Sequence, residues 1–346
     1  MLQCNAEFMN KPRLIFSSDL ALTGQDPRSL AKLCKKGVLK RVRQGIYVKA
    51  SEWALLTPAG KYGLQADAFR HLARTEPVYC HLTAGLLWGL WIVGTPEELM
   101  VRTEVTTGGQ SRNGVRRKIG APTDRVLRCG QFLITDKLTT TIALISKFAF
   151  PAAVAVCDSS LRPKNPRGQV NTFVPASQES TAVAVWEMDE PQGDPLTKDL
   201  LLAAAQQLPS QAARDRTIAV INFSSPLSGS AGESLSRAKM FQLGFPTPVL
   251  QKEYRLRDGR NAAVDFWFEE LNLAGEFDGK AKYLRQDWSG GSMEERLWKE
   301  KQREDDIRSQ GVRFVRWTWR VASDKNLLEQ VLRQAGLPQK TNHRRK

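Results

Sequence analysis

Residues 264–280 constrain the fold of this chain most, because their pattern is that of a β-hairpin. The first part, 264–268, is rich in aromatic and β-branched residues, and the polar residues 269–272 predict a turn. Apolar and polar residues then alternate, so side chains two positions apart share a face of the second strand. One face of that strand is therefore expected to carry three polar side chains: Glu276, Asp278 and Lys280.

The charges of this hairpin favour a metal site. Asp265 lies on the partner strand and is expected to reach the same patch as Glu276 and Asp278. Carboxylates so close repel one another unless a cation neutralises them, and Mg²⁺ takes oxygen ligands while keeping waters for chemistry. Lys280 would then orient or activate the attacking water, or stabilise the phosphorane-like negative charge. We predict Mg²⁺ or Mn²⁺ bound by these three acids, with either Glu276 or Asp278 as the main ligand; the alternative is a surface hairpin with solvated charges.

Known nucleases share this order of residues. The arrangement Asp265…Glu276-Phe-Asp278-Gly-Lys280 resembles the PD-(D/E)xK nuclease core, and its Glu-Phe-Asp-Gly string looks most like the Vsr-related short-patch endonucleases. Further along, the string Lys301-x-Arg-Glu-Asp305…Gly311-Val-Arg-Phe-Val-Arg-Trp317 resembles the same family. The resemblance covers about residues 228–332. It implies a restriction-endonuclease-like α/β/α domain that hydrolyses phosphodiester bonds with Mg²⁺.

A further acidic residue, Glu233, belongs to the same region. Ser230 is predicted to cap a helix, and Glu233 falls in the first turn of that helix. One interpretation is that its negative charge stabilises the helix N-terminus. The resemblance implies another, in which the first helix directs an extra acid at the metal. Glu233 is therefore a fifth candidate catalytic residue.

Residues 1–60 show the order of helix, turn, helix and wing. Asp26 suits the cap of a helix and Pro27 its first position, so a helix is predicted over 27–36, with Leu30, Leu33 and Cys34 facing inward. Residues 14–24 are expected to form the end of one helix and a second short helix. Residues 38–48 alternate as a β-wing does. This order is typical of a winged helix-turn-helix domain.

The same segment carries a cluster of positive charge. Eight basic residues and no acidic residue lie between Arg28 and Lys49. Together with a net charge of +15, this favours a polyanionic partner, here double-stranded DNA. The alternative is a basic, solvated helical hairpin. The candidate phosphate contacts, with the helix in a major groove, are Arg28, Lys32, Lys35, Lys36, Lys40, Arg41 and Arg43.

A second resemblance covers the N-terminal part. Residues 39–48 read Leu-x-Arg-Val-Arg-Gln-Gly-Ile-Tyr-Val, which resembles the N-terminal domain of the AbiEi antitoxin family over about residues 5–55. The middle region resembles the second AbiEi domain around Val-Cys-Asp-Ser-Ser-Leu, residues 156–161. These resemblances imply a DNA-binding regulator that represses its own operon, with a cognate toxin as its partner.

The predicted fold class is α+β multidomain. Residues 161–197 are rich in proline, glycine and polar residues, which indicates a linker or an irregular insertion. Five segments are predicted: a winged helix-turn-helix domain (1–60), an α/β middle domain (61–160), a linker or insertion with a helix (161–209), a restriction-endonuclease-like α/β/α domain (210–335) and a basic tail (336–346).

Other features exclude several classes of protein. The five cysteines include no Cys-x-x-Cys pair, which argues against a zinc site or a disulfide framework. No run of 18 apolar residues exists, and the first 13 residues lack a signal-peptide pattern. We therefore expect a cytoplasmic protein without a membrane partner. The sequence leaves its oligomeric state open.

Two functions remain. The first is a Mg²⁺-dependent DNA endonuclease, recruited by the winged helix and acting in phage defence or DNA processing. The second is an AbiEi-type antitoxin and autorepressor that keeps the nuclease fold as a scaffold. A scaffold does not need Asp265, Glu276, Asp278 and Lys280 together, so the sequence favours the first.

Overall fold

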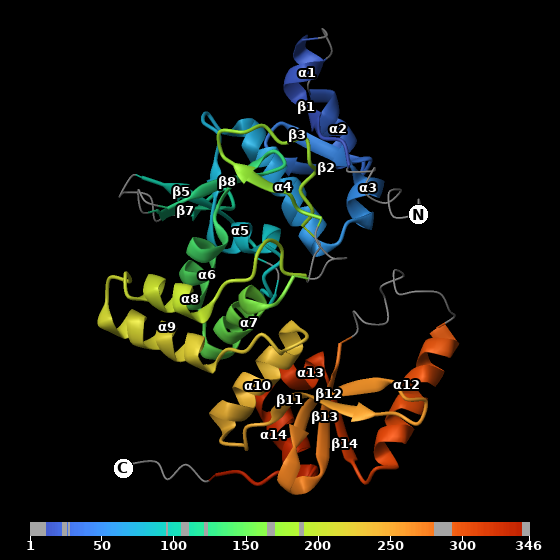
Figure 1. The fold of residues 1–346 in the computed structure, drawn as a ribbon. Helices are drawn as coiled ribbons and strands as arrows, with labels where there is room; N and C mark the ends of the chain where they lie inside the picture. Colours follow the sequence, from blue (N-terminus) through green and yellow to red (C-terminus); the bar gives the residue numbers. More distant parts are fainter. Residues whose placement is uncertain are drawn as a thin grey trace. The chain divides into compact units, whose positions relative to one another are not determined.

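The computed structural model describes residues 12–22, 26, 28–94, 96–104, 111–120, 124–164, 170–186, 190–279 and 293–340. These residues form a mixed α+β protein with several sheets (Figure 1). The chain divides into two compact units, one of residues 1–89, 94–140 and 166–193, and one of residues 90–93, 141–165 and 194–346. No helix in the described ranges is both long enough and apolar enough to span a membrane.

The first unit begins with a small sheet, ordered β1-β3-β2 and antiparallel throughout. Asp26 Oδ1 accepts the backbone N–H of Arg28 at 2.9 Å at the start of α2, and Gly37, at φ +75°, follows its end. The small sheet also packs on α4 through Ile46, Val48 and Leu64. The elements are β1 (Ile15–Phe16), α1 (Ser17–Leu22), α2 (Arg28–Lys35), β2 (Leu39–Arg43), β3 (Ile46–Lys49), α3 (Ala50–Leu55) and α4 (Pro58–Leu72).

Two details of this segment differ from the sequence-based expectation. Residues 15–16 pair with β3 as a strand instead of ending a helix, because β3 offers them a free edge. Leu30 is buried against Leu39 and Tyr47, as expected, but Leu33 is 37% exposed. The short helix α2 thus buries a narrower stripe than predicted. Pro27 lies outside the described residues.

A larger mixed sheet fills the rest of the first unit, in the order β10-β8-β9-β4-β5-β7-β6. Its core includes Tyr79 and Phe132, whose rings meet edge to face at 5.6 Å. The basic residues Arg112, Arg116, Arg117 and Lys118 lie on β6 and β7. The elements are β4 (Val78–Tyr79), α5 (His81–Leu87), β5 (Leu99–Thr103), β6 (Ser111–Arg112), β7 (Val115–Ile119), β8 (Val126–Cys129), β9 (Phe132–Thr135) and β10 (Phe173–Pro175).

The segment expected to be a linker is partly built into this sheet. Strand β10 pairs with β8. Asn171 donates to the carbonyl oxygens of Leu87 at 2.8 Å and Val185 at 2.9 Å, and Trp186 is buried against Phe132. Side-chain hydrogen bonds therefore order a stretch whose proline and glycine content indicates irregular structure. Residues 170–186 belong to the first unit.

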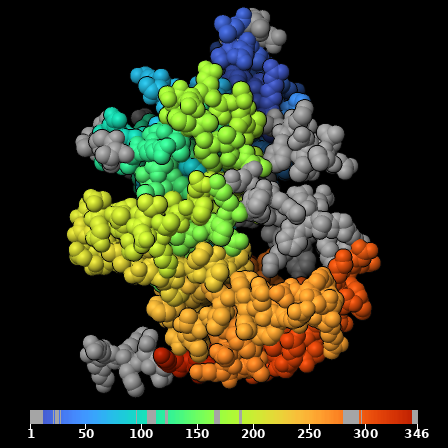
Figure 2. All heavy atoms as spheres, in the orientation of Figure 1, coloured from blue at the N-terminus to red at the C-terminus, as the bar shows by residue number. Residues whose placement is uncertain are grey.

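The helical part of the second unit surrounds one buried ion pair. Asp158 of α7 is fully buried and accepts two hydrogen bonds from Arg237 of α10, at 3.0 and 2.8 Å. It also accepts from Ser234 Oγ at 2.7 Å and from the Ser225 N–H at 2.7 Å. These contacts place α7 in the second unit, whereas the predicted boundary at residue 160 puts it in the middle domain. The helices are α6 (Lys137–Ile145), α7 (Phe150–Leu161), α8 (Lys198–Ala205), α9 (Gln211–Phe223) and α10 (Ala231–Leu243). Helices α8 and α9 form the yellow surface in Figure 2.

A four-stranded sheet, ordered β11-β12-β13-β14, forms the C-terminal part of the second unit (Figure 1). The first three strands are antiparallel neighbours, and β14 runs parallel to β13. One face packs on α10, α13 and α14 through Phe266, Phe277 and Trp317. The other packs on α12 through Ala274 and Ile307. The elements are β11 (Val249–Arg255), β12 (Asn261–Phe268), η1 (Glu269–Leu271), β13 (Leu273–Asp278), α12 (Met293–Arg308), β14 (Arg313–Thr318), α13 (Trp319–Ser323) and α14 (Lys325–Gln334).

Candidate functional site

The predicted hairpin is present as β12, the short helix η1 and β13. The backbone pairing of its strands runs from Phe268–Leu273 to Phe266–Gly275. At the next position the Asp265 side chain takes over, and its Oδ2 accepts the Phe277 N–H at 2.9 Å. Asp265 thus reaches the end of β13, the strand that carries Glu276 and Asp278.

Glu276 is buried between two arginines. The residue is only 5% exposed, and its carboxylate faces the layer formed by α12. Arg303 of α12 lies 2.6 Å from Oε1, and Arg316 of β14 lies 2.6 Å from Oε2. A carboxylate that loses water needs such partners. In this arrangement, arginines supply the positive charge that the sequence analysis assigns to a metal ion.

Arg316 joins further carboxylates around the same point. It lies 3.5 Å from Asp278, 3.0 Å from Glu300 and 2.8 Å from Glu304. Glu304 also pairs with Arg308, at 2.6 Å. Four carboxylates therefore share three guanidinium groups, those of Arg303, Arg308 and Arg316, which leaves an excess of one negative charge. Lys280, the remaining member of the predicted set, lies outside the described residues.

Burial and ion pairing act on these acids in opposite directions. Burial raises the pKa of Glu276, and the two arginines only partly oppose this increase. Burial also raises the pKa of Glu300, but hydrogen bonds and charge from Arg303 and Arg316 outweigh it and hold that pKa at about 2. Glu300 is therefore ionised over the whole physiological range, and it balances the arginines more firmly than Glu276 does.

Glu233 lies at the start of α10, where it both caps the helix and approaches Asp265. Ser230 caps the helix as predicted, accepting the Glu233 N–H at 3.3 Å, and its hydroxyl donates back to Glu233 Oε1 at 2.9 Å. This arrangement is related to a capping box, with the Glu233 side chain bonded to the Ser230 hydroxyl. Glu233 Oε2 accepts the Gly229 N–H at 2.6 Å and lies 3.3 Å from the Gln251 amide nitrogen. Both interpretations of Glu233 therefore have structural support.

Glycine makes the close approach of α10 to the sheet feasible. A Cβ atom at Gly232 would overlap the Phe277 ring. Because Gly232 has none, the first turn of α10 packs directly on β13, and Glu233 comes within reach of the strand that carries Glu276 and Asp278. Any larger side chain at 232 would push α10 and Glu233 away from the sheet.

The carboxylate oxygens match the ligands that Mg²⁺ prefers in kind, and their net negative charge favours a cation. Asp265 is near enough to Glu276 to raise its pKa. Nevertheless, no group of three or more His, Cys, Asp or Glu side chains is arranged to hold a metal within the parts of the chain that the structure describes. Arg303 and Arg316 contact Glu276 directly, and Arg316 also contacts Asp278.

The candidate DNA contacts of the first unit are mostly exposed. Five of the seven predicted residues are exposed on or just after α2 or at the start of β2, and Arg41 is exposed on β2 as well. Arg43 differs. Its guanidinium donates to the carbonyl oxygens of Gln65 at 3.1 Å and Asn113 at 2.9 Å, and it lies over the Phe69 ring. Burial lowers the pKa of Arg43. These contacts give Arg43 a structural task inside the first unit.

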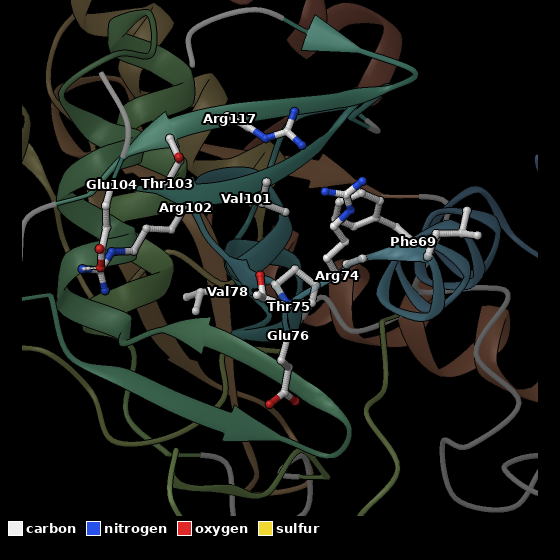
Figure 3. Close-up of a pocket in the computed structure, with 13 residues that line it drawn as sticks. Phe69, Arg74, Thr75, Glu76, Val78, Val101, Arg102, Thr103, Glu104 and Arg117 are labelled. Atoms are coloured by element: carbon white, nitrogen blue, oxygen red, sulfur yellow. Dashed lines mark ion pairs between the residues drawn. The ribbon is translucent and has the colours of Figure 1, made fainter. Parts of the chain in front are cut away.

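A pocket of about 590 Å³ lies elsewhere in the first unit (Figure 3). Its rim carries Arg74 after α4, Arg102 of β5 and Arg117 of β7, while Val78 and Val101 form part of its floor. None of the four candidate catalytic residues that the structure describes, Glu233, Asp265, Glu276 and Asp278, lines it. These four acids belong to the second unit, whereas the pocket is lined by residues of the first.

Gln251, Glu300, Arg303 and Arg316 are not among the site residues predicted from the sequence. The string that includes Arg303 and Arg316 resembles the Vsr-related family, and this resemblance implies no role for either arginine. Their spacing carries a usable signal, because Glu300 and Arg303 lie one helical turn apart and Arg316 follows Phe314 by two positions, which places both on one face of a strand. Comparisons with protein-family models and with curated proteins find no match to this chain.

Proposed function

We propose that this protein is a Mg²⁺-dependent DNA endonuclease whose N-terminal winged helix recruits it to double-stranded DNA. One observation carries the proposal: at the end of β13, the strand of Glu276 and Asp278, Asp265 of β12 accepts the Phe277 N–H and is linked through Gln251 to Glu233 of α10. We infer a restriction-endonuclease-like domain from this arrangement, together with the strand order and the helices on both faces of the sheet.

In this proposal, three of the acids bind the metal ion and the fourth assists them. Asp265, Glu276 and Asp278 would hold Mg²⁺ or Mn²⁺, with Glu233 as an additional acid. A divalent cation held by these residues would neutralise charge at the phosphate and assist the deprotonation of water. Hydrolysis adds one water molecule to phosphorus and breaks one P–O bond, and the leaving oxygen takes up a proton. Lys280 would stand beside the water, as the sequence resemblance implies.

Arg303 and Arg316 bear on the same proposal. In the described arrangement they neutralise Glu276 and Glu300, and they keep the buried carboxylates from repelling one another. A cation that binds Glu276 competes with these guanidinium groups. Released from Glu276, an arginine of this kind is suited to a phosphate oxygen, because its planar fork donates two parallel hydrogen bonds.

A second function is supported by the same arginines. If they hold Glu276 permanently, the domain is a scaffold, and the protein is an AbiEi-type antitoxin and autorepressor with a cognate toxin as partner. The exposed basic residues of α2 and β2 serve both functions equally. A place in phage defence or DNA processing, and a cytoplasmic location, suit both.

The deciding experiment is nicking of supercoiled plasmid by the purified full chain with Mg²⁺, Mn²⁺ or EDTA. Wild type is expected to nick only with a divalent cation. Asp278→Asn and Lys280→Ala are expected to abolish nicking and to leave duplex binding unchanged. Absence of metal-stimulated nicking on any DNA form, or full activity in both variants, would favour the regulator instead.

A further inference from the structure

Gln251 of β11 has a backbone conformation that is unusual for a strand. Its φ is +52°, in the left-handed region that residues other than glycine rarely adopt. The neighbouring pairs Leu250–Phe266 and Lys252–Val264 keep their register, so Gln251 stands opposite Asp265. Such a conformation persists only where the surroundings enforce it, and it often marks a functional position.

The side chain of Gln251 joins two of the candidate catalytic acids. Its Nε2 lies 3.3 Å from Glu233 Oε2 and 3.3 Å from Asp265 Oδ1. An amide nitrogen carries two hydrogens, so one group donates to both carboxylates. Gln251 thereby connects the first turn of α10 to the point where the β12–β13 backbone pairing ends.

The chemistry of this link differs from that of the neighbouring acids. Glu276 and Asp278 contact arginine, which neutralises them. Gln251 is uncharged, so it orients Glu233 and Asp265 without removing their negative charge. A lysine or arginine there would neutralise the pair, and an apolar residue would leave the two carboxylates to repel each other. A neutral donor is the choice that keeps both acids close together and available to a cation.

We propose that Gln251 is a positioning residue that holds Glu233 and Asp265 ready for a divalent cation, an inference that rests on the proposed nuclease function. The left-handed backbone places its amide between the acids. The strained backbone at position 251 therefore lowers the stability of the fold and provides the geometry of the site. Stability should then rise and the metal response should fall when glycine replaces Gln251.

Glycine substitution tests this separation, because glycine accepts a positive φ without strain and has no amide. Asn272→Gly is the matched control: Asn272 has φ +47° after η1 of the same sheet, and no contact of its side chain with the acids is among those described. Both variants are expected to melt at or above the wild-type temperature without metal. Only Gln251→Gly should lose the Mn²⁺-induced rise in melting temperature, and its nicking rate should fall by ~100-fold.

Gln251→Met keeps the side-chain length and the strained backbone but removes the donor, so it should lose the Mn²⁺ response without the gain in melting temperature. A full Mn²⁺ response together with wild-type nicking in Gln251→Gly would overturn the inference. A wild type that responds to Mn²⁺ but does not nick would refute the nuclease function. The Mn²⁺ responses of the two glycine variants would still test whether Gln251 positions the acids. A wild type with neither response would overturn both.

Discussion

The Asp265 carboxylate accepts the backbone N–H of Phe277 at 2.9 Å, across the two central strands of the C-terminal sheet. Backbone pairing between these strands ends one position earlier, at Phe266–Gly275. A side chain thus replaces a carbonyl oxygen in the ladder just where β13 presents Glu276 and Asp278. Asp265 therefore provides the hydrogen-bond acceptor for a backbone N–H of a buried strand, and it also contributes negative charge to the candidate site.

Two substitutions at Asp265 should separate these tasks. Asparagine keeps an oxygen that can accept the Phe277 N–H, so the free energy of unfolding of Asp265→Asn should stay within about 1 kcal/mol of wild type. The same variant should lose nicking, because it lacks the negative charge. Asp265→Ala leaves that N–H without its acceptor and should lose a further ~1–3 kcal/mol. Chemical denaturation of both variants measures the difference. Equal stability of the two would show that the Phe277 hydrogen bond does not stabilise the strand pair.

The hairpin could be predicted because its signal is local. Alternating residues and a polar turn specify β12 and β13, and Ser230 with Glu233 specifies the start of α10. The environment of the acids could not, because it depends on residues distant in sequence. Arg316 reaches Glu276 through the parallel pairing of β14 with β13, and no local pattern encodes that pairing.

Segment boundaries were harder to predict for a similar reason. Asp158 lies among residues whose pattern shows an apolar helix, yet its partner Arg237 is far along the chain and assigns α7 to the second unit. The segment containing Asn171 is rich in loop-forming residues, yet its amide fixes the chain by contacts with Leu87 and Val185. The amino-acid composition of a segment indicates its local structural preference, and hydrogen bonds to residues distant in the sequence override this preference.

The wing should bind DNA through Lys40 and Arg41 and not through Arg43. Lys40→Ala with Arg41→Ala is expected to weaken binding to every duplex and to lower the salt slope by about two, since each lost phosphate contact removes about one. Arg43→Ala breaks the hydrogen bonds to Gln65 and Asn113, so it should lower stability by ~1–3 kcal/mol. Mobility-shift titrations at several salt concentrations and thermal melts check this. An unchanged slope in the double variant would show that the wing does not contact phosphate.

Glu233→Gln should reveal whether the acid at the start of α10 serves more than the helix. Glutamine also completes a capping box, so the loss of stability should stay near 0.3–1 kcal/mol while nicking and its Mg²⁺ dependence decline. Ser210→Ala is a suitable control, because it removes the cap of α9, whose Oγ accepts the Ala213 N–H at 3.2 Å, at a cost of ~0.5–2 kcal/mol. Its nicking should match wild type. Full activity in Glu233→Gln would remove this residue from the site.

The arginine-held acids should leave a signature in the pH dependence of stability. The pKa of Glu300 falls from 4.5 in the unfolded chain to about 2 in the fold, chiefly because Arg303 and Arg316 overcome the effect of burial. A carboxyl with a lowered pKa stabilises the fold above its unfolded pKa, and this contribution disappears as the pH falls toward the folded value. Above pH 5, the free energy of unfolding of wild type should therefore exceed that of Glu300→Gln by ~1–2 kcal/mol. This value allows for solvent screening, because Glu300 is partly exposed.

That difference should shrink steadily between about pH 4.5 and pH 2, where Glu300 becomes protonated in the unfolded chain and then in the fold. Urea denaturation at a series of pH values measures it. Glu294→Gln is the matched control, since Glu294 is exposed in the first turn of the same helix, α12, and contacts neither arginine in the described structure. A difference between wild type and Glu300→Gln that stays constant down to pH 2 would mean that Arg303 and Arg316 do not hold Glu300 ionised, and the ion-pair arrangement around Glu276 would then have to be rejected.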